Sequence, residues 1–129
     1  MNEEAAILTG WRRGRLWYGR LRQRAVGLPT EVAFDWGWAL AREERHGDVL
    51  GFYHTHPAGF PTPSERDVRT MRAWVSSLGK PLLCVIASGD ELAAYLFATD
   101  EDAGHALETV ERFPRGVVVV IGGEKGSRL

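Results

Sequence analysis

His54-Thr55-His56-Pro57 lies in the middle of the chain, and after seven positions His56 is followed by Ser64-Glu65-Arg66-Asp67. In a strand, side chains two positions apart project from the same face, so His54 and His56 can hold one metal ion. The apolar-rich residues 48–53 predict such a strand, and Pro57 ends it because proline cannot extend the hydrogen-bond ladder. We therefore expect a strand that ends in two adjacent imidazoles.

The second half of this stretch predicts the start of a helix. Ser64 is a typical N-cap, and Asp67 at the third helical position completes a capping box. From the first helical turn, Asp67 can reach back to the metal held by the histidines. Two neutral nitrogens and one carboxylate leave a fourth tetrahedral position for water, as in catalytic zinc sites. Either half alone is common in proteins without metal, but together they predict one zinc ion (Zn2+) per chain on His54, His56 and Asp67.

The pattern His-x-His, seven residues, Ser, two residues, Asp resembles the JAMM motif of the MPN (JAB) metallopeptidases. That family also needs a glutamate on an early strand and a small residue seven positions later, which Glu3 and Gly10 provide. The resemblance implies an α/β fold, with residues 1–129 as a single MPN domain. In this cytidine deaminase-like fold, a curved mixed β-sheet is flanked by helices. It also implies a zinc-dependent metalloprotease or isopeptidase, deubiquitinase-like, that cuts after the C-terminal diglycine of a ubiquitin-like protein.

The resemblance assigns catalytic roles to Glu3 and Ser64. Zinc lowers the pKa of a bound water, and Glu3 takes the proton and passes it to the leaving amine. Ser64 donates a hydrogen bond to the developing oxyanion or holds the water. Glu4 is the rival base, although alternation along a strand places it on the opposite face. Chain termini fray, so Glu3 must be held by strand pairing, and a solvated N-terminal charge is the alternative for both glutamates.

Composition limits the classes of protein to consider. The chain has 129 residues, 44% of them apolar, which is enough to form one domain with a core. A net charge of −1 gives no bulk attraction to nucleic acid or membrane, and no apolar run approaches the roughly 20 residues of a membrane span. No secretory signal is visible, and the single Cys84 cannot form an internal disulfide, so we expect a cytoplasmic protein. Cys84 itself is expected to be a small buried strand residue.

Hydrophobic periodicity predicts an alternation of strands and helices. Strands are expected at residues 5–11, 15–24, 48–55, 82–87, 91–98 and 117–121, the first two as a hairpin. Helices are expected at residues 30–46, 64–78 and 100–113, the first two ended by Gly47 and Gly79. The inner face of the first helix is expected to consist of Val32, Trp36, Ala39 and Leu40.

Two surface features have more than one interpretation. Arg20, Arg22 and Arg24 alternate along one expected strand and could form a basic stripe for an acidic partner or nucleic acid. The near-zero net charge favours a solvated strand face instead. Phe34 and Trp38 are four positions apart and either form a partner-binding patch or pack under a neighbouring element.

The compact core resembles stand-alone prokaryotic members that process ubiquitin-like or sulfur-carrier proteins. By analogy, we expect a diglycine-ending protein of this kind as substrate, conjugation-system enzymes as further partners, and neither nucleic acid nor membrane. One alternative is a RadC-like JAB-domain protein, whose loop pattern is similar, although residues 86–90 depart from it and its usual N-terminal helical domain is missing. The other is a non-catalytic MPN scaffold, but such domains usually lose metal ligands that are present here.

Overall fold

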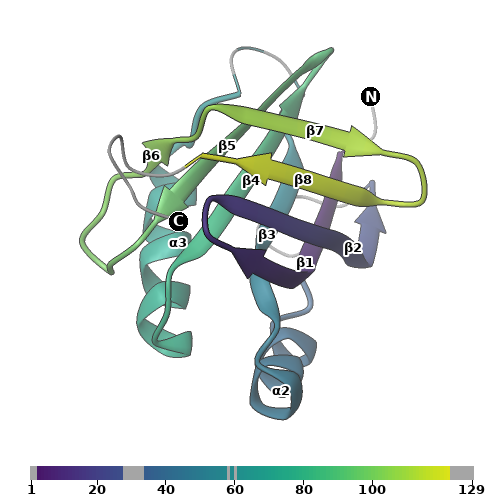
Figure 1. The fold of residues 1–129 in the computed structure, drawn as a ribbon. Coiled ribbons are helices and arrows are strands. Elements are labelled where there is room, and N and C mark those ends of the chain that lie inside the picture. The colour runs from purple at the N-terminus through teal and green to yellow at the C-terminus, as the bar shows by residue number, and fades with distance from the viewer. Residues whose placement is uncertain (1–2, 28–33, 58, 60, 123–129) are drawn as a thin grey trace.

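The computed structural model describes residues 3–27, 34–57, 59 and 61–122. Its strands form an eight-stranded sheet in the order β6-β5-β4-β3-β1-β2-β8-β7. This mixed sheet curls until β7 contacts β5, and two helices lie against its outer side (Figure 1). The predicted α/β class with a curved mixed sheet is therefore confirmed. The elements are β1 (Glu4–Arg13), β2 (Leu16–Val26), α2 (Trp36–His46), β3 (Val49–Thr55), α3 (Glu65–Leu78), β4 (Leu82–Ser88), β5 (Glu91–Phe97), β6 (His105–Ala106), β7 (Thr109–Phe113) and β8 (Val117–Ile121).

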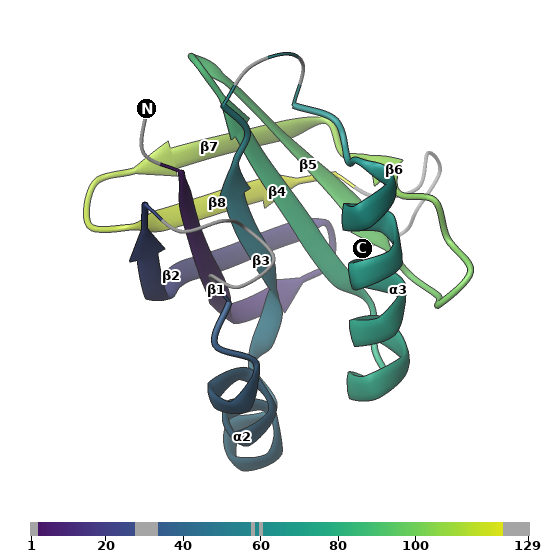
Figure 2. The ribbon, with the colours of Figure 1, turned by 180° about the vertical axis from the view of Figure 1, so that it is seen from behind.

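The strand that carries the histidines, β3, lies between β1 and β4 in the middle of the sheet. It pairs antiparallel with β1 and parallel with β4, and α3 provides the crossover that a parallel pair needs (Figure 2). Every residue of β3 before Thr55 is buried. His54 therefore lies on a buried strand that is paired on both sides, and His56 follows directly after it.

Apolar side chains form one cluster on each side of the curled sheet. The inner cluster includes Trp17, Tyr53 and Val120. The outer cluster joins Phe52 of β3 to Met71 of α3 under the helices. Because side chains alternate along a strand, Phe52 and His54 face the helices while Tyr53 faces the interior of the curl.

Two glycines allow close approach of strands near the centre of the sheet. A Cβ atom on Gly10 would lie 1.9 Å from the carbonyl oxygen of Tyr18. A Cβ atom on Gly51 would lie 2.0 Å from the carbonyl oxygen of Leu83, at the place where the β1–β3 register shifts. The small residue expected seven positions after Glu3 is thus required by the β1–β2 pairing itself.

The predicted helix at residues 100–113 is wrong, because this segment contains β6 and β7. The carboxylate of Asp102 accepts a hydrogen bond from the Ala98 amide at 2.7 Å, which closes a turn. Gly104 follows with a φ angle of +98°, a conformation that ends a helix. Antiparallel pairing of β7 with β8, and packing of Val110 on the inner cluster, outweigh the helix propensity of the acidic residues.

The first described helix begins later than predicted. Helix α2 starts at Trp36, because the Asp35 carboxylate caps it by accepting a hydrogen bond from the Trp38 amide at 3.0 Å. Gly47 ends it in a left-handed conformation, as predicted. Leu40 was expected on the inner face, but 44% of its surface is exposed. Trp36 and Ala39 do pack on the outer cluster, whereas Val32 and the predicted helix start at residue 30 lie outside the described residues.

The other predicted elements agree with the structure to within two residues at nearly every end. The β1–β2 hairpin, helix α3 between Ser64 and Gly79, and strands β4, β5 and β8 are all present. Cys84 is buried in β4, and burial raises the pKa of its thiol. No described helix has the length and apolar character needed to cross a membrane.

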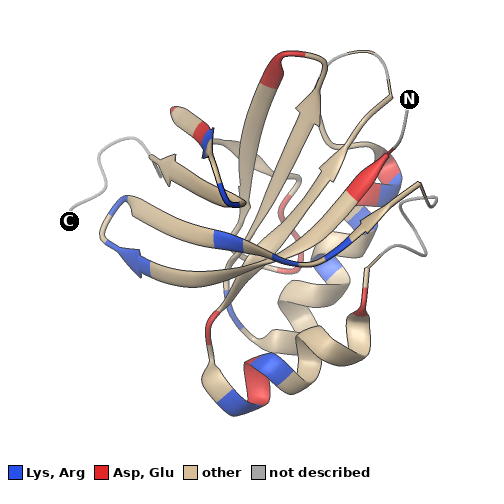
Figure 3. Ribbon diagram, turned by 90° about the vertical axis from the view of Figure 1, so that its right-hand side faces the viewer, with Lys and Arg blue, Asp and Glu red and all other residues tan. Residues whose placement is uncertain are grey.

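Arg20 and Arg24 are exposed, in agreement with the predicted solvated strand face, whereas Arg22 is half-buried. Arg22 lies over the Trp38 ring at 5.2 Å from its centroid, and Arg24 turns toward Glu4. Acidic and basic segments are interspersed over this side of the molecule (Figure 3). A basic stripe along β2 is therefore absent from the described strand.

An ion pair fastens the start of β3 to α2, and it yields a pH-dependent prediction. Arg42 donates to Asp48 through Nε at 2.8 Å and through Nη2 at 2.6 Å, and this hydrogen bonding lowers the pKa of Asp48. The ion pair stabilises the folded state fully at pH values above about 4, the pKa of Asp48 in the unfolded chain. This stabilisation is lost as the pH falls through the lower pKa of Asp48 in the folded protein. We expect Asp48→Asn to lower the unfolding temperature at neutral pH, and we expect a smaller deficit at about pH 3, which is below the unfolded pKa.

Thermal unfolding at both pH values, with the exposed Asp90→Asn as control, measures this effect. A deficit that is equal at both pH values would contradict the ion-pair explanation. A control variant that behaved like Asp48→Asn would show that general charge, rather than this contact, sets the stability.

Candidate metal centre

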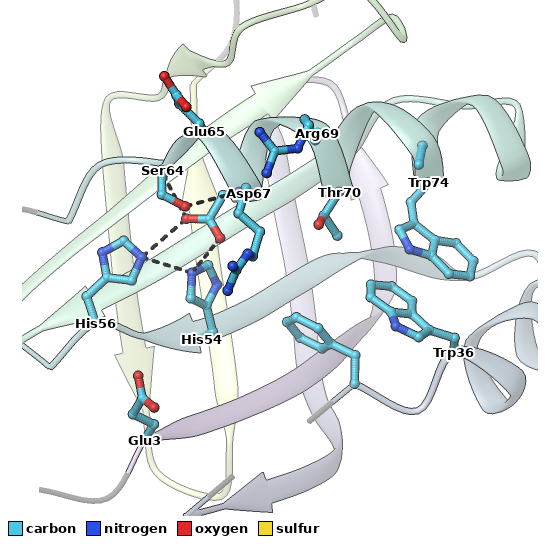
Figure 4. Close-up of a pocket in the computed structure, with 13 residues that line it drawn as sticks. Glu3, Trp36, His54, His56, Ser64, Glu65, Asp67, Arg69, Thr70 and Trp74 are labelled. Carbon is cyan, nitrogen blue, oxygen red and sulfur yellow. Dashed lines mark hydrogen bonds and ion pairs between the residues drawn. The ribbon is translucent and has the colours of Figure 1, made fainter. Parts of the chain in front are cut away.

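The two histidines project together from the end of β3 (Figure 4). His54 is 3% exposed and lies within the buried part of the strand. His56 follows the strand but stays attached to the sheet, since its amide donates to the carbonyl oxygen of Ala87 at 2.8 Å. The two Nε2 atoms are 3.1 Å apart. The strand therefore places both ring nitrogens at one point, as the spacing predicts.

The start of α3 directs the third side chain to the same point. Ser64 Oγ accepts a hydrogen bond from the Asp67 amide at 3.1 Å, and Asp67 Oδ2 accepts one from the Ser64 amide at 2.9 Å. This capping box fixes the carboxylate on the side of the helix that faces β3. Asp67 Oδ1 lies 3.3 Å from His54 Nε2, and Oδ2 lies 3.2 Å from His56 Nε2.

The three side chains fit a divalent cation better than they fit one another. A neutral imidazole carries a single N–H, yet each Nε2 atom faces both the other Nε2 atom and a carboxylate oxygen. His54 Nδ1 is buried and has no hydrogen-bond partner among the described residues. Each of the three residues offers one metal-ligand atom, and these atoms lie within 4.8 Å of one another. One cation between them would bind all three. Two nitrogens and one carboxylate are a ligand set that zinc accepts.

The carboxyl group of Asp67 is ionised at neutral pH. Burial alone raises its pKa, but a hydrogen bond and electrostatic attraction from His54, together with hydrogen bonds from Ser64, outweigh this and hold the pKa far below its ordinary range. A carboxylate that is already deprotonated binds a cation without releasing a proton. Asp67 is thus prepared electrostatically as a ligand.

A cavity of about 890 Å³ opens over the cluster. Ser64 lines it beside Asp67, and Glu3 lies across the cavity from α3 with its carboxylate directed toward the histidines (Figure 4). The Glu3 carbonyl oxygen accepts a hydrogen bond at 2.8 Å from the amide of Gly27, the residue that follows β2. All five residues that the sequence singles out as site residues therefore border one cavity.

The far wall of the cavity is aromatic, which the sequence did not predict. Trp36 and Trp74 stack at 4.1 Å between ring centroids, and Phe34 lies edge-on to Phe52 at 5.3 Å. Trp38 also packs against the outer cluster. Phe34 and Trp38 therefore both pack under neighbouring elements, which is one of the two interpretations that the sequence left open. The aromatic residues close to position 36 are the one sequence signal for this wall. The stacking of Trp36 on Trp74, however, depends on how helices α2 and α3 pack against each other.

Comparison with models of protein families matches residues 1–102 to the family described as prokaryotic homologs of the JAB domain. No curated protein matches the chain. The matched residues include Glu3 and the complete His-x-His and Ser-x-x-Asp pattern, and thus every residue of the candidate centre.

Proposed function

Since the chain belongs to the family of prokaryotic homologues of the JAB domain, we propose that it is a zinc-dependent metallopeptidase or isopeptidase of the JAMM type. The curved sheet would then be an MPN fold of the cytidine deaminase-like kind. The proposed reaction is hydrolysis of the peptide or isopeptide bond that follows the C-terminal diglycine of a ubiquitin-like or sulfur-carrier protein. The convergence of His54, His56 and Asp67 at the wall of a cavity is the observation that carries this proposal.

His54, His56 and Asp67 would hold one zinc ion. When bound, zinc supplies Lewis-acid chemistry, which polarises a carbonyl group and makes a coordinated water acidic. Glu3, which lies across the cavity, would accept the proton of the attacking water and return it to the leaving amine. The Oγ atom of Ser64 accepts a hydrogen bond from the Asp67 amide. Its hydroxyl hydrogen therefore remains available to donate to a developing oxyanion.

The cavity is large enough to admit a short segment of a peptide substrate. Its volume of about 890 Å³ lies within the range of small-molecule binding sites. The diglycine assignment and the involvement of conjugation-system enzymes rest on the resemblance to the family. Two glycines without side chains would let the scissile bond approach between Glu3 and the start of α3.

The test is cleavage of a fusion protein by the zinc-loaded chain. The fusion would join a ubiquitin-like protein that ends in diglycine to a reporter, and a matched fusion ending in Ala-Ala would serve as control. Cleavage after diglycine alone is the expected result. Stoichiometric zinc binding without cleavage of either fusion would contradict the peptidase proposal and favour the non-catalytic scaffold or the RadC-like alternative.

Ser64→Ala provides a smaller test of the mechanism. Loss of one oxyanion donor is expected to lower kcat more than tenfold, since single donors typically contribute about 10²–10³ in rate. Loss of the N-cap also costs roughly 1 kcal/mol of helix stability, so unfolding must be measured alongside the rate. Ser76→Ala, at an exposed position of the same helix, is the matched control. An unchanged kcat in Ser64→Ala would remove Ser64 from the mechanism.

A further inference from the structure

Glu3 and Glu4 are neighbours at the N-terminal end of the described chain, and only one of them can face the cavity. Side chains alternate along a strand, so a slip of one residue in the pairing of β1 would exchange the two carboxylates. In the structure Glu3 lines the cavity, while the side chain of Glu4 is on the other side of the sheet, where it is 12% exposed. In this arrangement the carboxylate of Glu4 makes contacts of its own.

Two arginines hold the carboxylate of Glu4. Arg24 donates from Nε to Oε2 at 2.6 Å, and Arg112 donates from Nη1 to Oε1 at 3.2 Å. Arg24 comes from β2 and Arg112 from β7, so three strands meet at this carboxylate. Charge-assisted hydrogen bonds of this kind are stronger than neutral ones, and Arg112 also contacts Tyr53, whose side chain lies on the side of the sheet opposite the cavity.

A bulge in β2 turns Arg24 toward Glu4. The β1–β2 pairing runs from Ile7 opposite Arg22 to Ala5 opposite Ala25, which leaves one extra residue in β2. Gln23 lies in this bulge and has a φ angle of +52°. Without the bulge, Arg24 would share the face of Arg22, so the irregularity re-aims this side chain, as bulges commonly do.

The same contacts reach the strand that carries the histidines. Arg112 Nη1 also donates to the hydroxyl oxygen of Tyr53 at 2.8 Å and lies over its ring, and Tyr53 precedes His54. The backbone amide of Glu4 donates to Thr55 Oγ1 at 2.7 Å, and Thr55 follows His54. The arginines and Glu4 are therefore fastened to both sequence neighbours of a candidate metal ligand.

We propose that Glu4, Arg24 and Arg112 form a register lock that selects Glu3, rather than Glu4, as the carboxylate facing the histidine–aspartate cluster. These are positioning residues, because they lie on the opposite side of the sheet and touch no reacting atom. The proposal rests on the proposed function only for the chemical role of Glu3. The selection of one glutamate over its neighbour is a property of the fold and can be measured without substrate.

Amide hydrogen exchange tests the lock directly. In Arg112→Met we expect the Glu4 amide, which donates to Thr55, and the Gly27 amide, which donates to the Glu3 carbonyl, to exchange at least about tenfold faster than in the wild type. Arg20→Met, at an exposed position of β2, should leave both rates unchanged. Unchanged protection in Arg112→Met would overturn the proposal. If that variant does not fold, Tyr53→Phe, which removes one acceptor of Arg112, is expected to show the same change to a smaller degree.

Kinetics of zinc-loaded variants distinguish positioning from general stability. Arg112→Met is expected to lower kcat roughly ten- to a hundredfold with little change in KM or zinc affinity, the scale of a misplaced catalytic group. Arg112→Lys should restore most of the rate. In the Glu3→Gln background, Arg112→Met should cause no further loss, since no base remains to be misplaced. An equal loss in both backgrounds would overturn the lock, whereas a wild type without activity would contradict the proposed function and leave the exchange test decisive.

Discussion

His56→Ala is expected to abolish stoichiometric zinc binding. The substitution leaves His54 and Asp67 as the remaining ligands of the cluster. Loss of an outer-shell partner alone typically weakens metal binding about 10–100-fold, so loss of a ligand is expected to weaken it by more than about a hundredfold. Titration with zinc at micromolar protein, followed by measurement of bound metal, should give one ion per wild-type chain and almost none per variant.

The interpretation requires that the variant remains folded. The attachment of residue 56 to β4 runs through its backbone amide and the Ala87 carbonyl, so alanine can keep this hydrogen bond. His46→Ala, at an exposed position at the end of α2, is the matched control and should bind zinc like the wild type. Full zinc binding by folded His56→Ala would show that zinc is held elsewhere on the chain.

Glu3→Gln is expected to retain zinc but to lose turnover. Glutamine has almost the same volume as glutamate, but its amide cannot accept a proton at neutral pH. General base catalysis contributes about 10²–10⁴ in rate, and we expect kcat to fall by a factor in this range while zinc affinity stays the same. Single-turnover cleavage of the diglycine fusion, measured beside a zinc titration, gives both quantities.

Glu44→Gln, at an exposed position of α2, provides the control and should cleave at the wild-type rate. A Glu3→Gln variant with full activity would show that Glu3 is not the base. Glu65, which also lines the cavity, would then be the next carboxylate to replace.

Local sequence signals explain which parts of the fold were predictable. The strand with the histidines, the capping box at Ser64 and the glycine caps at Gly47 and Gly79 are specified by nearby residues, and the structure has all of them. Residues 100–113 were predicted wrongly because their conformation depends on pairing of β7 with β8, a contact that helix propensity does not register. The start of α2 depends on Asp35 as cap, whereas the sequence pattern had indicated a start at residue 30.

In the candidate site, too, features set by nearby residues were predictable and features set by tertiary contacts were not. The spacing of His54, His56 and Asp67 predicts their convergence because a strand, a loop and a helix start are enough to produce it. The stacking of Trp36 on Trp74 requires two helices to meet, so no sequence spacing predicts it. Likewise, regular alternation placed Arg24 with Arg20 and Arg22, and only the bulge at Gln23 reverses its direction.

The capping box at the start of α3 also affects how the motif should be read in descendants of this protein. Asp67 and Ser64 stabilise the helix whether or not a metal is bound, so natural selection for folding would preserve both after catalysis had been lost. Among the described residues, the imidazole of His56 makes its hydrogen-bond contacts only with His54 and Asp67, and neither contact stabilises a helix end. An inactive descendant should therefore keep the serine and the aspartate and change His56 first, which makes that histidine the position by which active and inactive copies can be told apart.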